Sequence, residues 1–439
     1  MTDTLVPALS EPRPARSLRS TVAVLDGGLR VTAVRKPGVP LVELRLRVPF
    51  LSARTAHSAR SALLADTLLT GARGLDRAGF AAAIQGLGAS LHASANPDRL
   101  LISGNVLATQ LGRLLELLAA VLTDPTFARD DVATERERLV EKLTIARARP
   151  GVIANEALAR RMWGAHPYTD EVADPKDVAP VTPAQLRALH RGLVRPADAM
   201  LTLVGDLTPA RMVDLAQDKL RDWTGSGNLG RVPALPRSPG GPLLVVDRPG
   251  SVQSSLRLGG AALPRTDPDY PALQLANLIF GGYFSSRWTE NIREDKGYTY
   301  GPHSRVDHHV LGSTLVLDAE VATEVSAPSL LETWYELGRI AALPVSEAEV
   351  ESVRQYAIGT LALSTATQAG LASTLSALSA FGLGLDWITS HPSRLLATTV
   401  DQVGAAAARF FAPSGLTSVV VGDAEQITAP LAALGPVER

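Results

Sequence analysis

The sequence predicts an α+β protein made of two homologous, duplicated domains, each an antiparallel-rich sheet packed with helices. Three observations support this fold class: the order of strands and helices starts again in the second half, short segments recur at a constant offset, and a glycine- and proline-rich stretch separates the halves. A repeat at a fixed offset is typical of a duplicated structural unit. Because 439 residues exceed one ordinary core, we expect a repeated domain of about 210 residues.

The first half begins with strands. Residues 21–25 and 29–35 flank Asp26-Gly27-Gly28, a signal for a hairpin turn. Residues 42–48 alternate apolar and charged side chains, which is typical of a half-buried strand. Apolar periodicity and glycine or proline breaks predict the other elements of this half, which are helices at 56–70, 76–87, 111–122, 130–149, 182–193 and 209–223, and strands at 90–94, 99–106 and 199–204.

The second half repeats this order. It is predicted to contain strands at 243–247, 254–258 and 313–321, and helices at 267–280, around Leu331 and at 352–363. Three segments of the first half recur in the second at one constant offset: Thr182-Pro-Ala-Gln-Leu186 on Thr399-Val-Asp-Gln-Val403, Pro196 on Pro413, and Val204-Gly205-Asp206 on Val421-Gly422-Asp423. The helix that ends at Gly71 likewise falls on the helix that ends at Gly281.

The domain boundary is predicted at residues 224–242, TGSGNLGRVPALPRSPGGP, where glycine, serine and proline dominate and no periodicity remains. We therefore expect a flexible N-terminal arm at 1–19, a first domain at 20–223, the linker at 224–242 and a second domain at 243–439.

Composition excludes several classes of protein. A net charge of -1 gives no overall field for nucleic acid or an anionic membrane. The chain has no cysteine, which rules out disulfides, thiolate zinc sites and cysteine nucleophiles. No apolar run is long enough to span a membrane, and the first residues lack the pattern of a secretory signal. We expect a cytoplasmic protein with no nucleic-acid or membrane partner.

Residues 281–301, GGYFSSRWTENIREDKGYTYG, are the most informative stretch. Gly281 and Gly282 allow a sharp turn before a short helix, and a strand is predicted to begin near Tyr298. Arg293 and Tyr300 lie seven residues apart across the helix-to-strand turn. An arginine can hold a carbonyl or carboxylate with forked donors, and a tyrosine hydroxyl can stabilise an oxyanion. The alternative interpretation is an exposed arginine at a helix end and a half-buried tyrosine on a strand.

A duplicated α+β domain with IREDKGYTYG in its second copy resembles the pitrilysin family of zinc peptidases, in particular the two-domain branch of mitochondrial processing peptidase. The resemblance covers nearly the whole chain after the first twenty residues. It implies that Arg293 and Tyr300 bind the substrate backbone and assist the transition state. Gly281 and Gly282 are further candidate substrate-binding residues.

The family's zinc motif is H-x-x-E-H, on a helix of the first domain that ends in glycine. Its two histidines bind zinc, its glutamate activates the metal's water, and a second glutamate further along the chain is the third ligand. In this chain the histidine positions hold Ala62 and Asp66, and the glutamate position holds Ala65. The third ligand position falls on Lys142, or on Glu141 if the alignment is shifted by one. A lone Asp66–Glu141 pair is a poor zinc site, so no zinc is expected.

The remaining histidines do not form a metal site. His308 and His309 are adjacent on a predicted strand, so their side chains face opposite ways and cannot chelate one ion together. The others are scattered and are interpreted as ordinary polar residues: His57, His92, His166, His190, His303 and His391.

The resemblance therefore implies the non-metal subunit of a heterodimeric zinc peptidase, inactive alone and without a cofactor of its own. The partner is expected to be a homologous subunit with an intact H-x-x-E-H motif that carries the zinc. The substrate is expected to be an unfolded peptide added along a sheet edge. The alternative is a catalytically silent structural protein of the same fold. A third possibility, a new activity in the same cavity, has no second catalytic constellation to support it.

Overall fold

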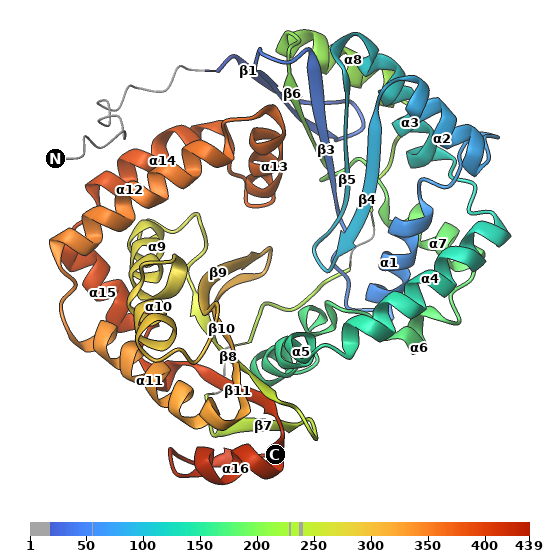
Figure 1. Ribbon diagram of the computed structural model, residues 1–439. Helices are drawn as coiled ribbons and strands as arrows, with labels where there is room; N and C mark the ends of the chain where they lie inside the picture. Colours follow the sequence, from blue (N-terminus) through green and yellow to red (C-terminus); the bar gives the residue numbers. More distant parts are fainter. Residues whose placement is uncertain (1–17, 55, 228–229, 237–239) are drawn as a thin grey trace, which may run out of the picture.

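The computed structural model describes residues 18–54, 56–227, 230–236 and 240–439, and contains two six-stranded sheets (Figure 1). The strand order is β1-β2-β6-β3-β5-β4 in the first sheet and β12-β7-β11-β8-β10-β9 in the second. The predicted α+β class with two duplicated domains is confirmed. Residues 1–17 of the predicted arm, and residues 228–229 and 237–239 of the predicted linker, lie outside the described residues.

The first sheet and its helices come from residues before the predicted linker. The strands are β1 (Ser20–Val24), β2 (Arg30–Arg35), β3 (Leu41–Pro49), β4 (Ser90–Asn96), β5 (Arg99–Leu107) and β6 (Met200–Gly205). The helices are α1 (His57–Thr67), α2 (Arg77–Gly86), α3 (Leu111–Thr123), α4 (Arg129–Arg147), α5 (Pro150–Trp163), α6 (Pro175–Val178), α7 (Pro183–Leu193) and α8 (Pro209–Leu220), with 3₁₀ turns η1 (Ala108–Gln110) and η2 (Pro167–Asp170).

The second sheet and its helices come from residues after the predicted linker. The strands are β7 (Leu243–Asp247), β8 (Gln253–Ala262), β9 (His303–His309), β10 (Gly312–Ala322), β11 (Thr417–Gly422) and β12 (Val437–Glu438). The helices are α9 (Tyr270–Asn277), α10 (Arg287–Thr289), α11 (Ser326–Ala342), α12 (Glu347–Ser364), α13 (Gln368–Ser379), α14 (Leu385–Ala397), α15 (Val400–Phe410) and α16 (Ala424–Ala432). Two π-helical turns, η3 (Leu278–Gly282) and η4 (Glu290–Asp295), and two 3₁₀ turns, η5 (Thr323–Val325) and η6 (Pro413–Gly415), complete the half.

Five strands of each sheet share one topology. The order β2-β6-β3-β5-β4 corresponds to β7-β11-β8-β10-β9, with the first pair parallel and every other pair antiparallel in both. Only the sixth strand differs, since β1 pairs antiparallel with β2 whereas β12 pairs parallel with β7. The duplication predicted from the sequence offset is therefore a duplication of topology.

The recurring sequence segments have the same local function in both halves. Thr182 is the N-cap of α7 and Thr399 is the N-cap of α15, each in a capping box in which the threonine and a glutamine three residues later satisfy each other's backbone N–H groups. Gly205 and Gly422 end β6 and β11. A Cβ at Gly205 would lie 2.3 Å from the carbonyl oxygen of Leu41 on the neighbouring strand, so only glycine allows this close approach.

Each half contributes one helix to the inner face of the other half's sheet. Helix α5 packs on β8 and β11 of the second sheet, and α13 packs on β3 and β6 of the first (Figure 1). Leu158 and Met162 of α5 lie in a buried cluster with Val419 of β11, and Leu371 of α13 clusters with Val204 of β6. The two halves therefore share buried apolar surface.

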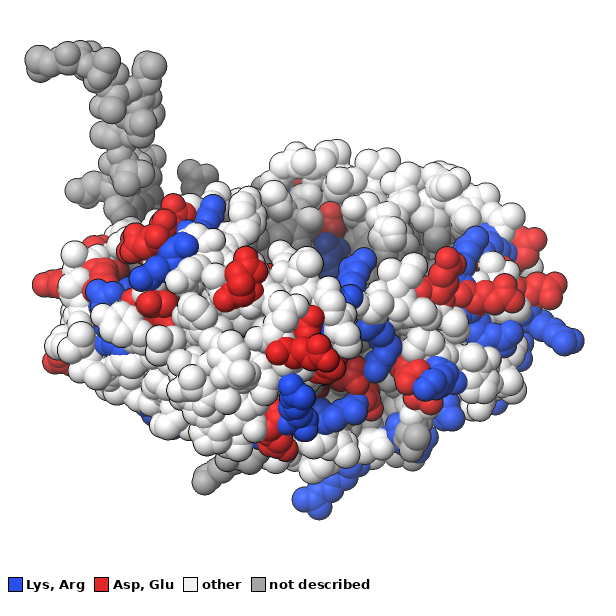
Figure 2. Space-filling view, turned by 60° about the horizontal axis from the view of Figure 1, so that its bottom comes forward, with Lys and Arg blue, Asp and Glu red and all other residues white. Residues whose placement is uncertain are grey.

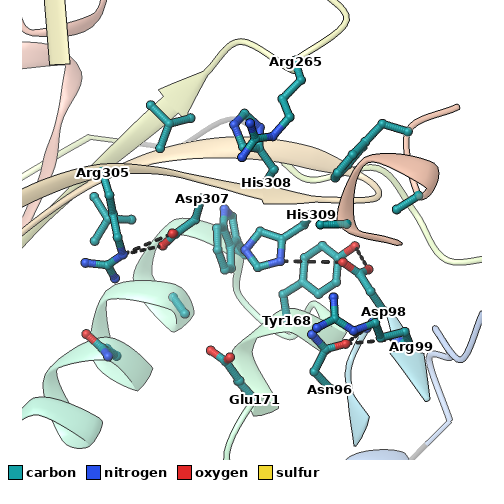
Figure 3. Close-up of a pocket in the computed structure, with 18 of the residues that line it drawn as sticks. Asn96, Asp98, Arg99, Tyr168, Glu171, Arg265, Arg305, Asp307, His308 and His309 are labelled. Atoms are coloured by element: carbon teal, nitrogen blue, oxygen red, sulfur yellow. Dashed lines mark hydrogen bonds and ion pairs between the residues drawn. The ribbon is translucent and has the colours of Figure 1, made fainter. Parts of the chain in front are cut away.

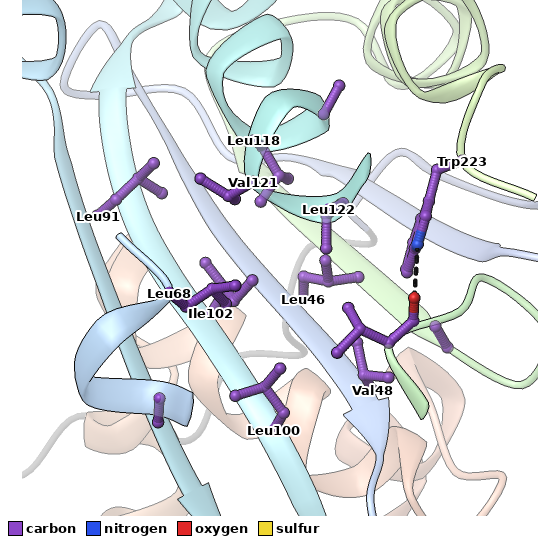
Figure 4. Packing of buried hydrophobic residues seen from close by; sticks show 14 of the residues in the cluster. Leu46, Val48, Leu68, Leu91, Leu100, Ile102, Leu118, Val121, Leu122 and Trp223 are labelled. Atoms are coloured by element: carbon purple, nitrogen blue, oxygen red, sulfur yellow. Dashed lines mark hydrogen bonds between the residues drawn. The ribbon is translucent and has the colours of Figure 1, made fainter. Parts of the chain in front are cut away.

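The main cores lie on the outer faces of the sheets. Apolar side chains of β3 and β5 point toward α3 (Figure 4). The labelled residues are Leu46 and Val48 of β3, Leu100 and Ile102 of β5, and Leu118, Val121 and Leu122 of α3. The indole N–H of the buried Trp223 donates to the carbonyl oxygen of Val194 at 3.0 Å, which satisfies the one polar atom of this large side chain. The second core is formed in the same way under α9, α11 and α15.

Some predicted boundaries were wrong. The helix predicted at 130–149 ends at Arg147, and Pro150 begins the separate helix α5, because proline is favoured in the first turn but not inside a helix. The strand predicted to begin near Tyr298 begins at His303. Among the described residues, no helix combines the length and the apolar character needed to cross a membrane.

Candidate functional site

The four positions predicted to have lost the zinc motif lie together. Ala62, Ala65 and Asp66 are on α1, Lys142 is on the neighbouring α4, and all four line one cavity of about 610 Å³ in the first domain. The structure thus brings these four positions into one cavity wall. Neither alanine can bind a metal, and the lysine places a cation where a carboxylate ligand is expected.

The remaining carboxylate at this wall is not suited to metal binding. Asp66 is open to the cavity, yet the surrounding wall partly desolvates it and raises its pKa, while Lys142 acts in the opposite direction. Within the described part of the chain there is no group of three or more histidine, aspartate or glutamate side chains that could hold a metal. The residues present do not fit a zinc ion.

His57 lies on the same cavity wall but is held in a structural contact. Its Nε2 atom lies 2.6 Å from the carbonyl oxygen of Phe50, and its pKa is lowered by burial. A carbonyl accepts only, so Nε2 carries the proton and cannot act as a base toward the Ser61 hydroxyl, 3.2 Å away. This serine and histidine are therefore not a nucleophile–base pair.

Arg293 and Tyr300, which the sequence places seven residues apart, are in contact. The Arg293 guanidinium lies 5.1 Å from the centre of the Tyr300 ring and 4.4 Å from the centre of the Phe284 ring, within cation–π range. Its Nε atom lies 3.3 Å from a carboxylate oxygen of Glu294. Tyr300 is 88% exposed and lies outside any strand, so the half-buried strand tyrosine of the alternative interpretation is wrong.

The turn that carries Arg293 is held by hydrogen bonds to helix α11. Asn291, two residues earlier in η4, donates to the carboxylates of Glu332 and Glu336 on α11 at 3.0 and 2.9 Å. Gly297 ends the segment with a φ of 66°, a left-handed conformation that glycine adopts without strain. The Arg293 segment is therefore hydrogen-bonded to α11, and the Arg293 side chain is 27% exposed.

Gly281 and Gly282 do not form the sharp turn expected from the sequence. Both belong to η3, and neither has a positive φ. A Cβ at Gly281 would lie 2.9 Å from the Trp288 ring, and one at Gly282 would lie 2.7 Å from the Asn277 side-chain nitrogen. The prediction of a turn was wrong: the glycines allow close packing between η3 and its neighbours.

A second large cavity, about 580 Å³, lies between the two domains and was not predicted (Figure 3). It is lined by residues of β3, β4 and β5 from the first domain, of β9 from the second, and of both exchanged helices. Neither Arg293 nor Tyr300 lines this cavity or the one beside Asp66. The only sequence signal for it was the row of charged residues that alternates with apolar ones along β3.

His308 and His309 both reach the cavity between the domains, although they are adjacent on β9. They contact different groups, as predicted from strand geometry: His308 lies 5.3 Å from the Tyr270 ring, and His309 lies 4.5 Å from the Tyr168 ring. Burial lowers the pKa of His308 to about 3, with the nearby Arg265 acting in the same direction. His308 is therefore neutral at ordinary pH.

A hydrogen-bonded network joins the domains at one end of this cavity. The hydroxyl of Tyr168 donates to Asp98, and burial together with this hydrogen bond raises the pKa of Tyr168. The turn between β9 and β10 docks on the same two side chains, because the N–H of Val310 donates to Asp98 and that of Leu311 donates to the Tyr168 oxygen, each at 3.2 Å. Asp98 is thus a structural acceptor with both oxygens engaged.

The outer surface gives no sign of a polyanionic partner on the face drawn in Figure 2. Lysine and arginine side chains lie beside aspartate and glutamate side chains there, without a broad patch of one sign. A surface that binds nucleic acid is expected to show a positive stripe or patch.

Comparison with known proteins gives a consistent result. Residues 61–176 match the family model described as insulinase (peptidase family M16), and residues 180–356 match the model described as peptidase M16 inactive domain. An uncharacterised zinc protease of Mycobacterium tuberculosis is 26% identical over 422 residues, which cover 92% of this chain and 93% of the relative. A probable inactive metalloprotease of Bacillus subtilis is 28% identical over 201 residues, which cover 44% of this chain and 47% of the relative.

Two solved structures share the fold. The peptidase M16 inactive domain from Pseudomonas fluorescens has a TM-score of 0.84 and 26% identity, covering 92% of this chain and 98% of that chain. A protease from Helicobacter pylori has a TM-score of 0.81 and 16% identity, covering 92% of this chain and all of that chain (100%). The match extends over both halves in each case.

Proposed function

Because the chain belongs to the peptidase M16 family, the pitrilysin family that the sequence resembles, we propose that it is the zinc-free subunit of a heterodimeric peptidase. The observation that carries this proposal is the wall formed by Ala62, Ala65, Asp66 and Lys142, where the scaffold of a metal site is kept without its ligands. A homologous partner with an intact H-x-x-E-H motif supplies the zinc and its water. This chain has no cofactor of its own.

In this proposal Arg293 and Tyr300 act on a substrate bound at the partner's site. The forked N–H groups of Arg293 hold a backbone carbonyl of the peptide, and the Tyr300 hydroxyl donates to the oxyanion that forms at the scissile carbonyl. Two features support these roles. Tyr300 projects from the surface, as a side chain that completes a site on another chain must, and the cation–π contact orients both groups before substrate arrives.

The substrate is proposed to be an unfolded peptide that adds to a sheet edge. Both β4 and β9 are edge strands, and residues of both line the cavity between the domains. An edge strand presents unpaired N–H and C=O groups that a peptide backbone can pair with. Gly281 and Gly282 are proposed to assist substrate binding indirectly, because their close packing supports the segment that leads to Arg293.

A catalytically silent structural protein is the second candidate. The observation that favours it is the position of Arg293 and Tyr300, which line neither the cavity beside Asp66 nor the cavity between the domains. A pair that only packs against Phe284 would have no catalytic role. The names of the relatives are consistent with either candidate, since they include zinc proteases and a probable inactive metalloprotease.

The test is reconstitution with a two-domain homologue that carries an intact H-x-x-E-H motif, ideally one encoded by the neighbouring gene. Each chain alone and the mixture are assayed for cleavage of an unfolded peptide, and the complex is weighed by light scattering. We expect a one-to-one complex that alone cleaves peptide. A partner that is fully active without this chain would support the silent role, and cleavage by this chain alone would overturn the proposal.

A further inference from the structure

We propose that Arg47 and Arg99 form a binding site for a carboxylate group of a peptide, in the cavity between the two domains. The inference rests on the proposed function in that it names the class of peptide the subunit takes. It concerns residues outside both the degenerate metal wall and the Arg293–Tyr300 pair.

The two arginines share the inner face of the first sheet. Arg47 is on β3, and Pro49, two residues later on the same face, pairs directly with Arg99 at the start of β5. Both side chains line the cavity, and Arg47 is only 5% exposed. Within the described residues, neither guanidinium has a hydrogen-bond acceptor or an ion-pair partner. The guanidinium nitrogens open onto the cavity instead, where a carboxylate of a bound ligand can accept hydrogen bonds from them.

The two positive charges of Arg47 and Arg99 are only partly balanced by the one negative charge of Asp98. Asp98 is the carboxylate that attracts both guanidinium groups, and its oxygens already accept hydrogen bonds from Tyr168 and from the backbone of Val310. Burial, and then repulsion by Arg99, lower the pKa of Arg47 to about 10, despite the attraction of Asp98. Two cations against one engaged carboxylate give a net positive site that a further carboxylate would neutralise.

Other charged residues around the cavity are placed differently. Arg305 is paired with Asp307 and Asp318. Arg265 lies by His308, away from Arg99, and its guanidinium is over the Tyr270 and Trp387 rings (Figure 3). Glu171 lines the cavity but forms no ion pair with either arginine of the proposed site. Arg265 also has no ion pair among the described residues, but it is apart from the other two, so Arg47 and Arg99 are the unpaired arginines that lie together at the Asp98 end of the cavity.

The duplication shows that the fold does not require an arginine at position 47. Arg47 pairs with Met200 on β6, and Gly259 pairs with Thr417 on β11; Thr417 lies at the recurring offset from Met200, so Gly259 is the structural counterpart of Arg47. In the second half, α5 covers that position so closely that a Cβ at Gly259 would lie 2.8 Å from the Met162 sulfur. In the first half, the equivalent helix α13 ends at Ser379 and leaves the cavity open above Arg47.

The cavity suits a peptide carboxylate. Its volume of about 580 Å³ holds a few residues of extended chain. Asn96 at the end of edge strand β4 and residues of edge strand β9 line it, so the peptide backbone can pair with an edge while its carboxylate reaches the arginines. A guanidinium accepts a carboxylate in a planar, two-pronged geometry. The carboxylate is either the C-terminus or an aspartate or glutamate side chain.

The test measures binding of three fluorescein-labelled peptides of one alanine-, threonine- and glutamine-rich sequence to the full chain by fluorescence anisotropy. The first has a free C-terminal carboxylate, the second a C-terminal amide, and the third a C-terminal amide and one internal glutamate. We expect one or both carboxylate-bearing peptides to bind about tenfold or more tightly than the amide, and which of them does so identifies the source of the carboxylate.

The preference should be lost in Arg47→Gln and in Arg99→Gln, and kept in Arg113→Gln, which removes an equally positive but exposed side chain on α3. Arg99 is only partly buried, so its variant decides the matter if Arg47→Gln does not fold. Equal binding of the three peptides, binding of none, or a preference that survives both substitutions would overturn the inference. Because these are binding assays on this chain alone, such a result leaves the reconstituted turnover with the partner as an independent measure of the proposed function.

Discussion

Arg45 and Arg257 occupy equivalent positions in the two halves, and each donates a hydrogen bond to the helix contributed by the other half. Arg45 pairs with Thr202 on β6 and Arg257 pairs with Val419 on β11, and Val419 lies at the recurring offset from Thr202. The Nε of Arg45 lies 3.2 Å from the Ser373 hydroxyl on α13, and the Nε of Arg257 lies 2.8 Å from the Asn155 side-chain oxygen on α5. Each of the two exchanged helices therefore accepts a hydrogen bond from an arginine of the sheet that it covers.

The first prediction is that Arg257→Ala weakens the junction between the halves. The substitution removes the hydrogen bond to Asn155 and the ion pair with Glu320, whose Oε1 lies 2.7 Å from the guanidinium. Urea unfolding should show a loss of about 1–3 kcal/mol in the free energy of unfolding. Arg113→Ala, on the exposed surface of α3, is the control and should change stability little. Equal effects of the two substitutions would mean that the contact to α5 contributes nothing.

The local features of this fold could be predicted, while the contacts between the halves could not. The threonine caps of α7 and α15 and the glycine ends of β6 and β11 depend on neighbouring residues, so their recurrence at one offset is visible in the sequence. Helices α5 and α13 were both missed, because the apolar side of each packs on a sheet formed by distant residues.

The candidate sites also differ in how far they could be predicted from the sequence. Ala62, Ala65 and Asp66 share a single helix, so the loss of the metal ligands could be read by placing the motif of the resembled family on this one segment. Arg47 faces a cavity whose walls come from both domains. Its missing partner is a property of the folded chain, and no spacing in the sequence indicates it.

The second prediction is that the purified chain binds no stoichiometric zinc and cleaves no peptide alone, because Ala62, Ala65, Asp66 and Lys142 supply no adequate set of ligands. Metal analysis after dialysis against zinc checks it. A variant with Ala62→His, Ala65→Glu, Asp66→His and Lys142→Glu is the positive control and should gain bound metal, since these positions share one cavity wall. One tightly held zinc per unmodified chain would contradict the prediction.

The third prediction is a loss of stability in mild acid that depends on His190. This histidine on α7 is 2% exposed, contacts the carbonyl oxygen of Val121 at 3.0 Å, and has its pKa lowered by burial to about 4. As the pH falls from about 6.5 toward 4, the unfolded chain takes up a proton that the folded chain does not, so stability decreases by up to about 3 kcal/mol. At higher pH the histidine is neutral in both states, and this dependence disappears.

Urea unfolding at about pH 7 and about pH 5 measures this effect. His190→Gln keeps a donor for the Val121 carbonyl but has no titrating ring, so the free energy of unfolding should fall less between the two pH values than it does in the unmodified chain. His391, whose pKa is also lowered to about 4 by burial, contributes in the same direction in both proteins. An unchanged pH dependence in His190→Gln would show that this histidine is already accessible to protons in the folded state.

The last prediction is that Arg293 and Tyr300 serve turnover in the complex rather than stability of this chain. Tyr300 is 88% exposed, and the rigid part of its neighbourhood is held by Asn291 and α11, so neither side chain is part of the core. Tyr300→Phe removes one donor to the oxyanion and keeps the ring under Arg293. If it acts as a typical oxyanion donor, the loss is about 2.7–4 kcal/mol, or about a hundredfold or more in rate. Arg293→Ala should remove the forked hydrogen bonds to the substrate backbone and lower turnover as well.

Each variant is mixed with the zinc-bearing partner, and turnover, complex formation and melting temperature are measured on the same preparation. Lys296→Ala is the control, since it removes a neighbouring charge whose only ion pair among the described residues is with Glu332, without altering the Arg293–Tyr300 contact. We expect turnover to fall in Arg293→Ala and Tyr300→Phe with melting temperature and complex formation nearly unchanged, because two surface side chains contribute little to the core. Full turnover in both variants would favour the silent structural role, and turnover that falls only together with folding or complex formation would make the pair structural.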